Sequence, residues 1–183
     1  MLEQYLINHC APTLASLKTA NLFNCTAENP TALQMAVSRW QALLAPKGVE
    51  LLLLRENGNR ALVYVYRPDR LARDLQQPGV AAFLAHCGYT GTAPAACLEV
   101  LRRKLAVSSD FPHEIGLFLS YPPEDVKGFI NHCANGFKCA GLWKVYGDEE
   151  KARSLFEKYR KCTEIYCTLW QSGLKLEQLA VAV

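Results

Sequence analysis

The chain has 183 residues, of which half are apolar and a fifth are charged, so its composition excludes a disordered chain. Twenty basic and 17 acidic residues give a formal net charge of +3. With the basic residues scattered along the chain, this near balance argues against a nucleic-acid binder.

The first half of the chain predicts helices followed by a β-hairpin. Residues 2–9 form a short amphipathic start, and Pro12 near a first turn favours a second helix over 11–19. Asn29-Pro30 is typical of a capped helix start, and apolar residues at helical spacing continue to Leu44. The runs 49–55 and 60–67 flank Glu-Asn-Gly-Asn, which predicts a hairpin.

The second half alternates predicted helices with two further predicted strands. In chain order these are helices at 68–76, 78–86 and 93–107, a strand at 114–119, a helix at 122–130, a strand at 140–146 and a long helix at 148–172. No linker divides the chain, so we expect one α+β domain over residues 1–183. Its sheet would be mostly antiparallel and four-stranded, built from the hairpin 49–67 and the strands 114–119 and 140–146.

The chain shows no pattern of a membrane or secreted protein. Its longest aliphatic run, residues 51–54, is far shorter than the roughly 20 residues of a membrane helix. The N-terminal segment is acidic where a signal peptide is basic. The chain has eight cysteines without a Cys-x-x-Cys pair, and most of them are best interpreted as small buried thiols in a reducing or anaerobic cell. We therefore expect a cytoplasmic location.

Cys10 and His113 are the candidate catalytic pair. A thiol at or just before a helix start has a lowered pKa, and a histidine at a strand entry is a typical general base. Asn131, Glu114 or Asp125 would orient the imidazole. The alternative is structural: Cys10 is buried at a helix junction, and His113 packs under Trp143 or Tyr121 while Glu114 forms an ion pair.

Three of the four histidines directly precede a cysteine, which raises a second kind of site. The pairs are His9-Cys10, His86-Cys87 and His132-Cys133. Imidazole and thiolate both bind zinc, iron and copper, so a metal or haem site is one interpretation. Two of these pairs fall where a helix is predicted to end, and there the helix dipole alone favours a histidine.

Aromatic and cationic residues recur together along the chain. A pocket for an anionic or planar ligand and an exposed sheet face both explain this pattern. The candidate ligand-binding residues are Lys18, Tyr66, Arg67, Glu114, Tyr121, Trp143 and Lys144. No phosphate-binding glycine loop accompanies them.

Several stretches together resemble a family of domains of unknown function from anaerobic Firmicutes. They are Cys-Ala-Pro-Thr-Leu-Ala-Ser-Leu-Lys at 10–18, Asn-Leu-Phe at 21–23, Tyr-Val-Tyr-Arg at 64–67, Phe-Pro-His-Glu-Ile-Gly-Leu-Phe-Leu at 111–119 and Trp-Lys-Val-Tyr at 143–146. The resemblance spans nearly the whole chain and implies a cytoplasmic, stand-alone domain without an assigned activity. The order of Cys10 and His113 is also similar to that in papain-like cysteine enzymes, although their characteristic sequences around the cysteine are absent.

These observations leave three functional hypotheses. The first is a thiol-dependent enzyme on a small acyl, amide or thiol substrate, with Cys10 as nucleophile, His113 as base, and Lys18 and Tyr66 holding an anionic group. The second is a non-catalytic module that binds a small ligand, a metal or haem. The third is an adaptor that contacts a partner through its apolar tail, residues 179–183. The oligomeric state stays open.

Overall fold

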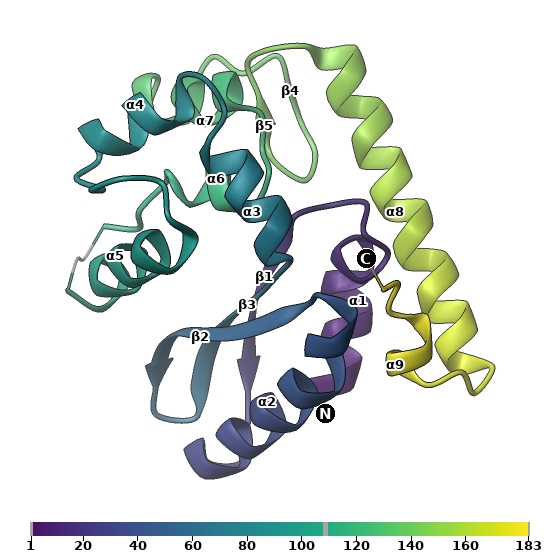
Figure 1. The fold of residues 1–183 in the computed structure, drawn as a ribbon. Helices are drawn as coiled ribbons and strands as arrows, with labels where there is room; N and C mark the ends of the chain where they lie inside the picture. The colour runs from purple at the N-terminus through teal and green to yellow at the C-terminus, as the bar shows by residue number, and fades with distance from the viewer. Residues whose placement is uncertain (1, 108–109, 183) are drawn as a thin grey trace. The chain divides into compact units, whose positions relative to one another are not determined.

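A computed structural model describes residues 2–107 and 110–182 of the chain. These residues form two compact units (Figure 1). Unit 1 comprises Met1–Asp69 with Lys161–Val183, and unit 2 comprises Arg70–Arg160. The long helix α8, Glu149–Gln171, contributes residues to both units. The assignment of the whole chain to one domain stays a prediction.

Unit 1 contains a three-stranded antiparallel sheet with strand order β1-β3-β2. Its elements are α1 (Leu2–Leu14), β1 (Ala20–Thr26), α2 (Pro30–Leu44), the 3₁₀ turn η1 (Ala45–Lys47), β2 (Glu50–Asn57), β3 (Arg60–Tyr66) and α9 (Leu176–Leu179). Apolar side chains of α1 and α2 and alternate residues of the sheet form a common core, which includes Leu6, Trp40 and Val63.

Local signals place α2 and the hairpin where the sequence predicts them. The Asn29 side chain accepts a hydrogen bond of 2.8 Å from the Ala32 amide, and Pro30 occupies the first turn of α2. The β2–β3 turn contains Gly58 with φ of +59°, a conformation that glycine adopts without a steric cost. A bulge between Leu53 and Arg55 shifts the register of this hairpin.

The predicted helix over 11–19 is wrong. Helix α1 continues through Pro12 to Leu14, and residues 20–26 then form β1. Pro12 lies in the last turn of α1, so its missing N–H and its ring affect only the few helix hydrogen bonds near that end. β1 was not predicted because its residues only partly alternate in burial, and its pairing with β3 depends on a distant segment.

Unit 2 consists mainly of helices. They are α3 (Pro68–Leu75, which begins in unit 1), α4 (Val80–His86), α5 (Pro94–Val107), α6 (Ile115–Phe118), α7 (Pro123–Asn131) and the first part of α8, with a small hairpin of β4 (Cys139–Ala140) and β5 (Lys144–Val145). The hairpin is antiparallel and separate from the three-stranded sheet.

The predicted strand at 114–119 is also wrong, because this segment forms the single-turn helix α6. Its residues Ile115–Leu119 are all buried, and periodicity cannot distinguish a short buried strand from a short buried helix. The predicted strand at 140–146 is in part correct: it includes Ala140 of β4 and the whole of β5, but a turn at 141–143 divides it into the two arms of a hairpin. The α+β class and the antiparallel pairing are confirmed, whereas the four-stranded sheet is replaced by three strands and a separate hairpin. Within the described ranges, no helix combines the length and the apolar character that crossing a membrane requires.

Candidate functional site

Asp125 connects α7 to the β4–β5 hairpin in unit 2. Its carboxylate is buried and accepts hydrogen bonds of 2.7 Å from the Trp143 indole N–H and from the amides of Tyr146 and Gly147. A carboxylate that accepts several N–H bonds replaces the hydration that it loses on burial. Asp125 therefore holds the hairpin and its Trp-Lys-Val-Tyr sequence against α7, and does not contact His113 through any of these bonds.

A group of aromatic and cationic side chains lies where α7, this hairpin and the segment before α6 meet. The His113 ring meets the Phe129 ring edge to face at 4.9 Å, and Phe111 lies 6.1 Å from His113. The Lys144 ammonium lies 5.8 Å from the ring centre of Phe129 and 4.7 Å from that of Phe137. We call these five residues, Phe111, His113, Phe129, Phe137 and Lys144, the Phe129 cluster.

The Phe129 cluster reaches the surface. Phe111 and Phe137 are each 39% exposed, and His113 is exposed as well. The Lys144 ammonium donates a hydrogen bond of 2.9 Å to the carbonyl of Ala134, which fixes its position. In the part of the chain that the structure describes, no hydrogen bond engages either ring nitrogen of His113. The predicted packing of this ring against Trp143 or Tyr121 is therefore replaced by contacts with two phenylalanines.

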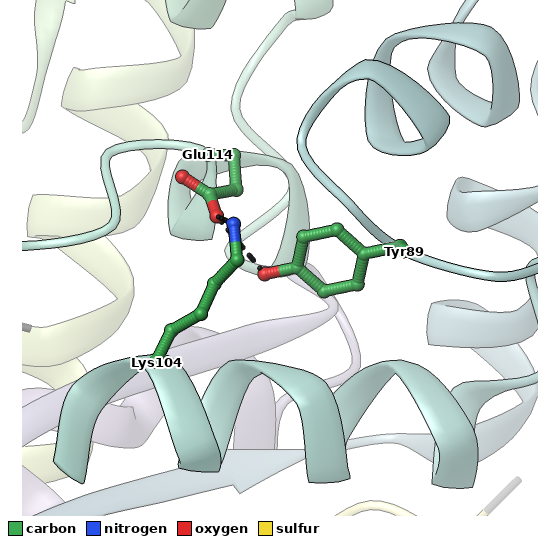
Figure 2. Close-up of polar contacts among 3 residues, drawn as sticks. All are labelled: Tyr89, Lys104 and Glu114. Carbon is green, nitrogen blue, oxygen red and sulfur yellow. Dashed lines mark hydrogen bonds and ion pairs between the residues drawn. The ribbon is translucent and has the colours of Figure 1, made fainter. Parts of the chain in front are cut away.

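Glu114 points into a different environment from its neighbour His113. One of its carboxylate oxygens accepts hydrogen bonds from the Lys104 ammonium at 2.5 Å and from the Tyr89 hydroxyl at 3.1 Å (Figure 2). Burial, together with the charge of Glu114, raises the pKa of Tyr89. The ion pair is largely buried on the Glu114 side, and it is the kind of contact that the structural alternative expects for this residue.

Tyr121 and Trp143 stack on each other with ring centres 4.7 Å apart. Trp143 in turn meets Phe156 of α8 edge to face at 4.4 Å. Tyr121 also lines a cavity of about 330 Å³ within unit 2, and burial raises its pKa to about 12. The structure therefore brings together two of the predicted ligand-binding residues, and one of them, Tyr121, lines a cavity.

Cys10 does not lie at a helix start. It is fully buried in the interior of α1, and this burial raises the pKa of its thiol although the charge of Lys18 acts in the opposite direction. Burial likewise lowers the pKa of Lys18 to about 8, with Cys10 opposing the shift. Cys10 belongs to unit 1 and His113 to unit 2, so their action as a catalytic pair stays a prediction.

Tyr66 and Arg67, at the end of β3, have structural partners in unit 1. The Tyr66 hydroxyl donates a hydrogen bond of 2.6 Å to Glu50, and burial, the hydrogen bond and the carboxylate charge together raise its pKa. The Arg67 side chain is 1% exposed, and its guanidinium donates to four backbone carbonyls, those of Thr13, Leu14, Lys47 and Val181.

The His-Cys pairs are distributed over several elements. His86 ends α4 and its Nδ1 lies 2.9 Å from the Ala82 carbonyl, while His132 caps α7 and stacks on Tyr146. His9 lies inside α1, and its ring groups with those of Tyr5 and Phe23, with the three ring centres 5.6 to 6.0 Å apart. Over residues 2–107 and 110–182, no group of three or more His, Cys, Asp or Glu side chains is placed to hold a metal ion.

Sequence reasoning missed Phe111, Phe129 and Phe137 as members of a site, because apolar side chains carry no motif of their own.

No curated protein and no solved structure matches this chain. A family model does match it, over residues 6–180. The chain therefore belongs to the family described as "Protein of unknown function (DUF3793)".

Proposed function

We propose that the protein is a non-catalytic binding module and that the Phe129 cluster binds a planar, anionic ligand. One observation carries this proposal: the ring of Phe129 contacts both the imidazole of His113 and the ammonium of Lys144. These two residues lie in the Phe-Pro-His-Glu-Ile-Gly and Trp-Lys-Val-Tyr stretches, 31 positions apart in the chain.

The residue types of the cluster suit such a ligand. The half-exposed rings of Phe111 and Phe137 offer apolar surface for offset stacking against a flat molecule. Lys144 supplies a positive charge that is already positioned by the Ala134 carbonyl, so little side-chain entropy is lost when it meets an anionic group. The imidazole of His113 is left to donate or accept a hydrogen bond, or to bind a metal at the centre of the ligand.

The geometry gives less support to the hypothesis of a thiol-dependent enzyme. A nucleophilic cysteine is a thiolate in a partly exposed, electropositive position, whereas Cys10 is fully buried and its pKa is raised. All eight cysteines are free thiols, five of them buried, as suits a protein of a reducing cytoplasm. We extend the proposal accordingly to a cytoplasmic protein of an anaerobic bacterium, in line with the family resemblance of the sequence.

The test is an anaerobic titration with two porphyrins, followed by absorbance. Haemin is flat, carries two carboxylates and offers iron to His113, while metal-free protoporphyrin IX has the same plane and charges without the iron. We expect both to bind. His113→Ala should lower the affinity for haemin about tenfold and the affinity for protoporphyrin much less, since only haemin gains a bond to imidazole. Lys144→Gln should lower the affinity for both porphyrins, and Lys144→Arg should restore it.

His86→Ala and Lys158→Gln are the matched controls, because both residues are exposed and neither belongs to the cluster. Non-specific adsorption of porphyrin to apolar surface would leave affinity the same in all five variants. That outcome, or the absence of binding by both porphyrins, would overturn the proposal.

A further inference from the structure

The cavity beside Tyr121 is a second site, independent of the Phe129 cluster. All the residues that line it belong to unit 2, and its volume of about 330 Å³ falls within the range of small-molecule pockets. At roughly 30 Å³ per water molecule, this volume accommodates a ligand of about ten non-hydrogen atoms.

The wall of the cavity combines apolar and charged side chains. Val80, Leu117 and Leu155 supply the apolar part, and Asp74, Glu124 and Lys151 supply the charges. Two helices begin at the cavity, since Glu124 lies in the first turn of α7 and Lys151 in the first turn of α8. A ligand in this space therefore meets apolar contacts and both signs of charge.

Glu124 and Lys151 line the same cavity but do not neutralise each other. Among the residues that the structure describes, neither side chain forms an ion pair or a hydrogen bond. Opposite charges that face one space without touching leave room for a molecule that carries the complementary charges. The Glu124 carboxylate offers a partner for an ammonium group and Lys151 a partner for an anion, so the site favours a ligand that carries both charges over a simple anion.

We propose that this cavity binds a free α-amino acid with an apolar side chain. The ammonium group of the ligand pairs with Glu124, its carboxylate pairs with Lys151, and its side chain packs on Val80, Leu117 and Leu155. An amino acid of nine non-hydrogen atoms, such as leucine, matches the volume.

Binding is measured by amide shifts of ¹⁵N-labelled protein with three probes. They are L-leucine, L-leucinamide, which lacks the carboxylate, and 4-methylpentanoate, which lacks the ammonium group. We expect leucine to shift the amides of Ser120, Tyr121 and Lys151 and to bind about tenfold more tightly than either analogue, as loss of one charged partner implies.

Two substitutions separate the roles of the charges. Glu124→Gln should lower the affinity for leucine about tenfold and leave the affinity for 4-methylpentanoate unchanged. Lys151→Gln should lower the affinity for leucine by a similar factor and leave the affinity for leucinamide unchanged. Both residues are exposed, so the folded state tolerates these changes. Glu157→Gln and Lys158→Gln, which lie on α8 with Lys151 but outside the cavity, serve as controls.

Equal affinity for leucine and its two analogues would overturn the proposal, as would the absence of any amide shift at millimolar leucine. The proposal would also be overturned if the cavity variants and their controls changed the affinity for leucine by the same factor. Lys144→Gln, which tests the Phe129 cluster, should leave leucine binding unchanged. The two proposals therefore fail or succeed separately.

Discussion

Replacement of Arg67 should strongly destabilise unit 1. The guanidinium is buried and donates to the last-turn carbonyls of α1, to the end of η1 and to the C-terminal segment at Val181. Carbonyls at a helix C-terminus have no partner within the helix, and a positive charge there also interacts favourably with the dipole. One side chain thus joins three separate segments of the chain.

The size of the effect follows from the four hydrogen bonds. A hydrogen bond with a charged donor stabilises the folded state by about 1.5 to 3 kcal/mol, and Arg67→Met removes all four. The same substitution also removes the cost of burying the charge, which is several kcal/mol and partly offsets this loss. We therefore expect Arg67→Met to lower the free energy of unfolding by about 3 kcal/mol. That loss is a large fraction of the roughly 5 to 15 kcal/mol that stabilises a typical domain.

Arg67→Lys distinguishes the shape of the guanidinium from its charge. A lysine keeps the buried charge, but its three N–H donors converge on one nitrogen and cannot reach four separated carbonyls. We expect it to be at least as destabilising as Arg67→Met. The assay is urea unfolding followed through tryptophan fluorescence, with Arg60→Lys on the same strand as an exposed control. A loss below about 1 kcal/mol for Arg67→Lys would refute the reasoning, because charge alone would then suffice.

Three further predictions concern single residues. Burial lowers the pKa of Lys18 from 10.5 to about 8, so above pH 8 the unfolded state binds more protons than the folded state. The free energy of unfolding should therefore rise from pH 8 to 9, whereas at higher pH the buried thiol of Cys10, whose pKa is raised, acts in the opposite direction. Lys18→Met should abolish this rise, measured as the midpoint of urea unfolding. Ser120→Gly should stabilise the protein by about 1 kcal/mol in the same assay, because Ser120 has φ of +57° and a buried hydroxyl without a partner among the described residues. Gly128→Ala should cost about 2 kcal/mol, since a Cβ there overlaps the Tyr146 side chain, and Tyr146→Ala should reduce that cost in the double variant.

The elements that the sequence predicted well are those with strong local signals. The Asn29 cap and the Pro30 first turn define α2, and the Asn-Gly turn at Gly58 defines the hairpin, because in both cases neighbouring residues decide the conformation. The segment 114–119 lacked such a signal. Its helical conformation depends on a left-handed Ser120, whose amide and that of Tyr121 bond back to the carbonyls of Leu117 and Gly116.

The candidate site was predictable only in part, for a related reason. His113 and Lys144 are recognisable from their sequence surroundings, but their common contact, Phe129, lies on a third segment. Likewise, the position of Cys10 depends on where α1 ends, and Pro12 suggested a boundary that the packing of α1 overrides. Such arrangements depend on tertiary contacts, which no spacing rule along the chain contains.

Helix α7 relates the two proposed sites through Asp125. The helix carries Glu124, which lines the cavity, and Phe129, which centres the cluster, while Asp125 between them binds the hairpin that carries Lys144. A buried carboxylate that accepts three N–H groups cannot be replaced by an amide without leaving a donor facing a donor. Asp125 lies between the two proposed sites in α7 and lines neither, so we expect it to position the hairpin that carries Lys144 and not to orient the His113 imidazole.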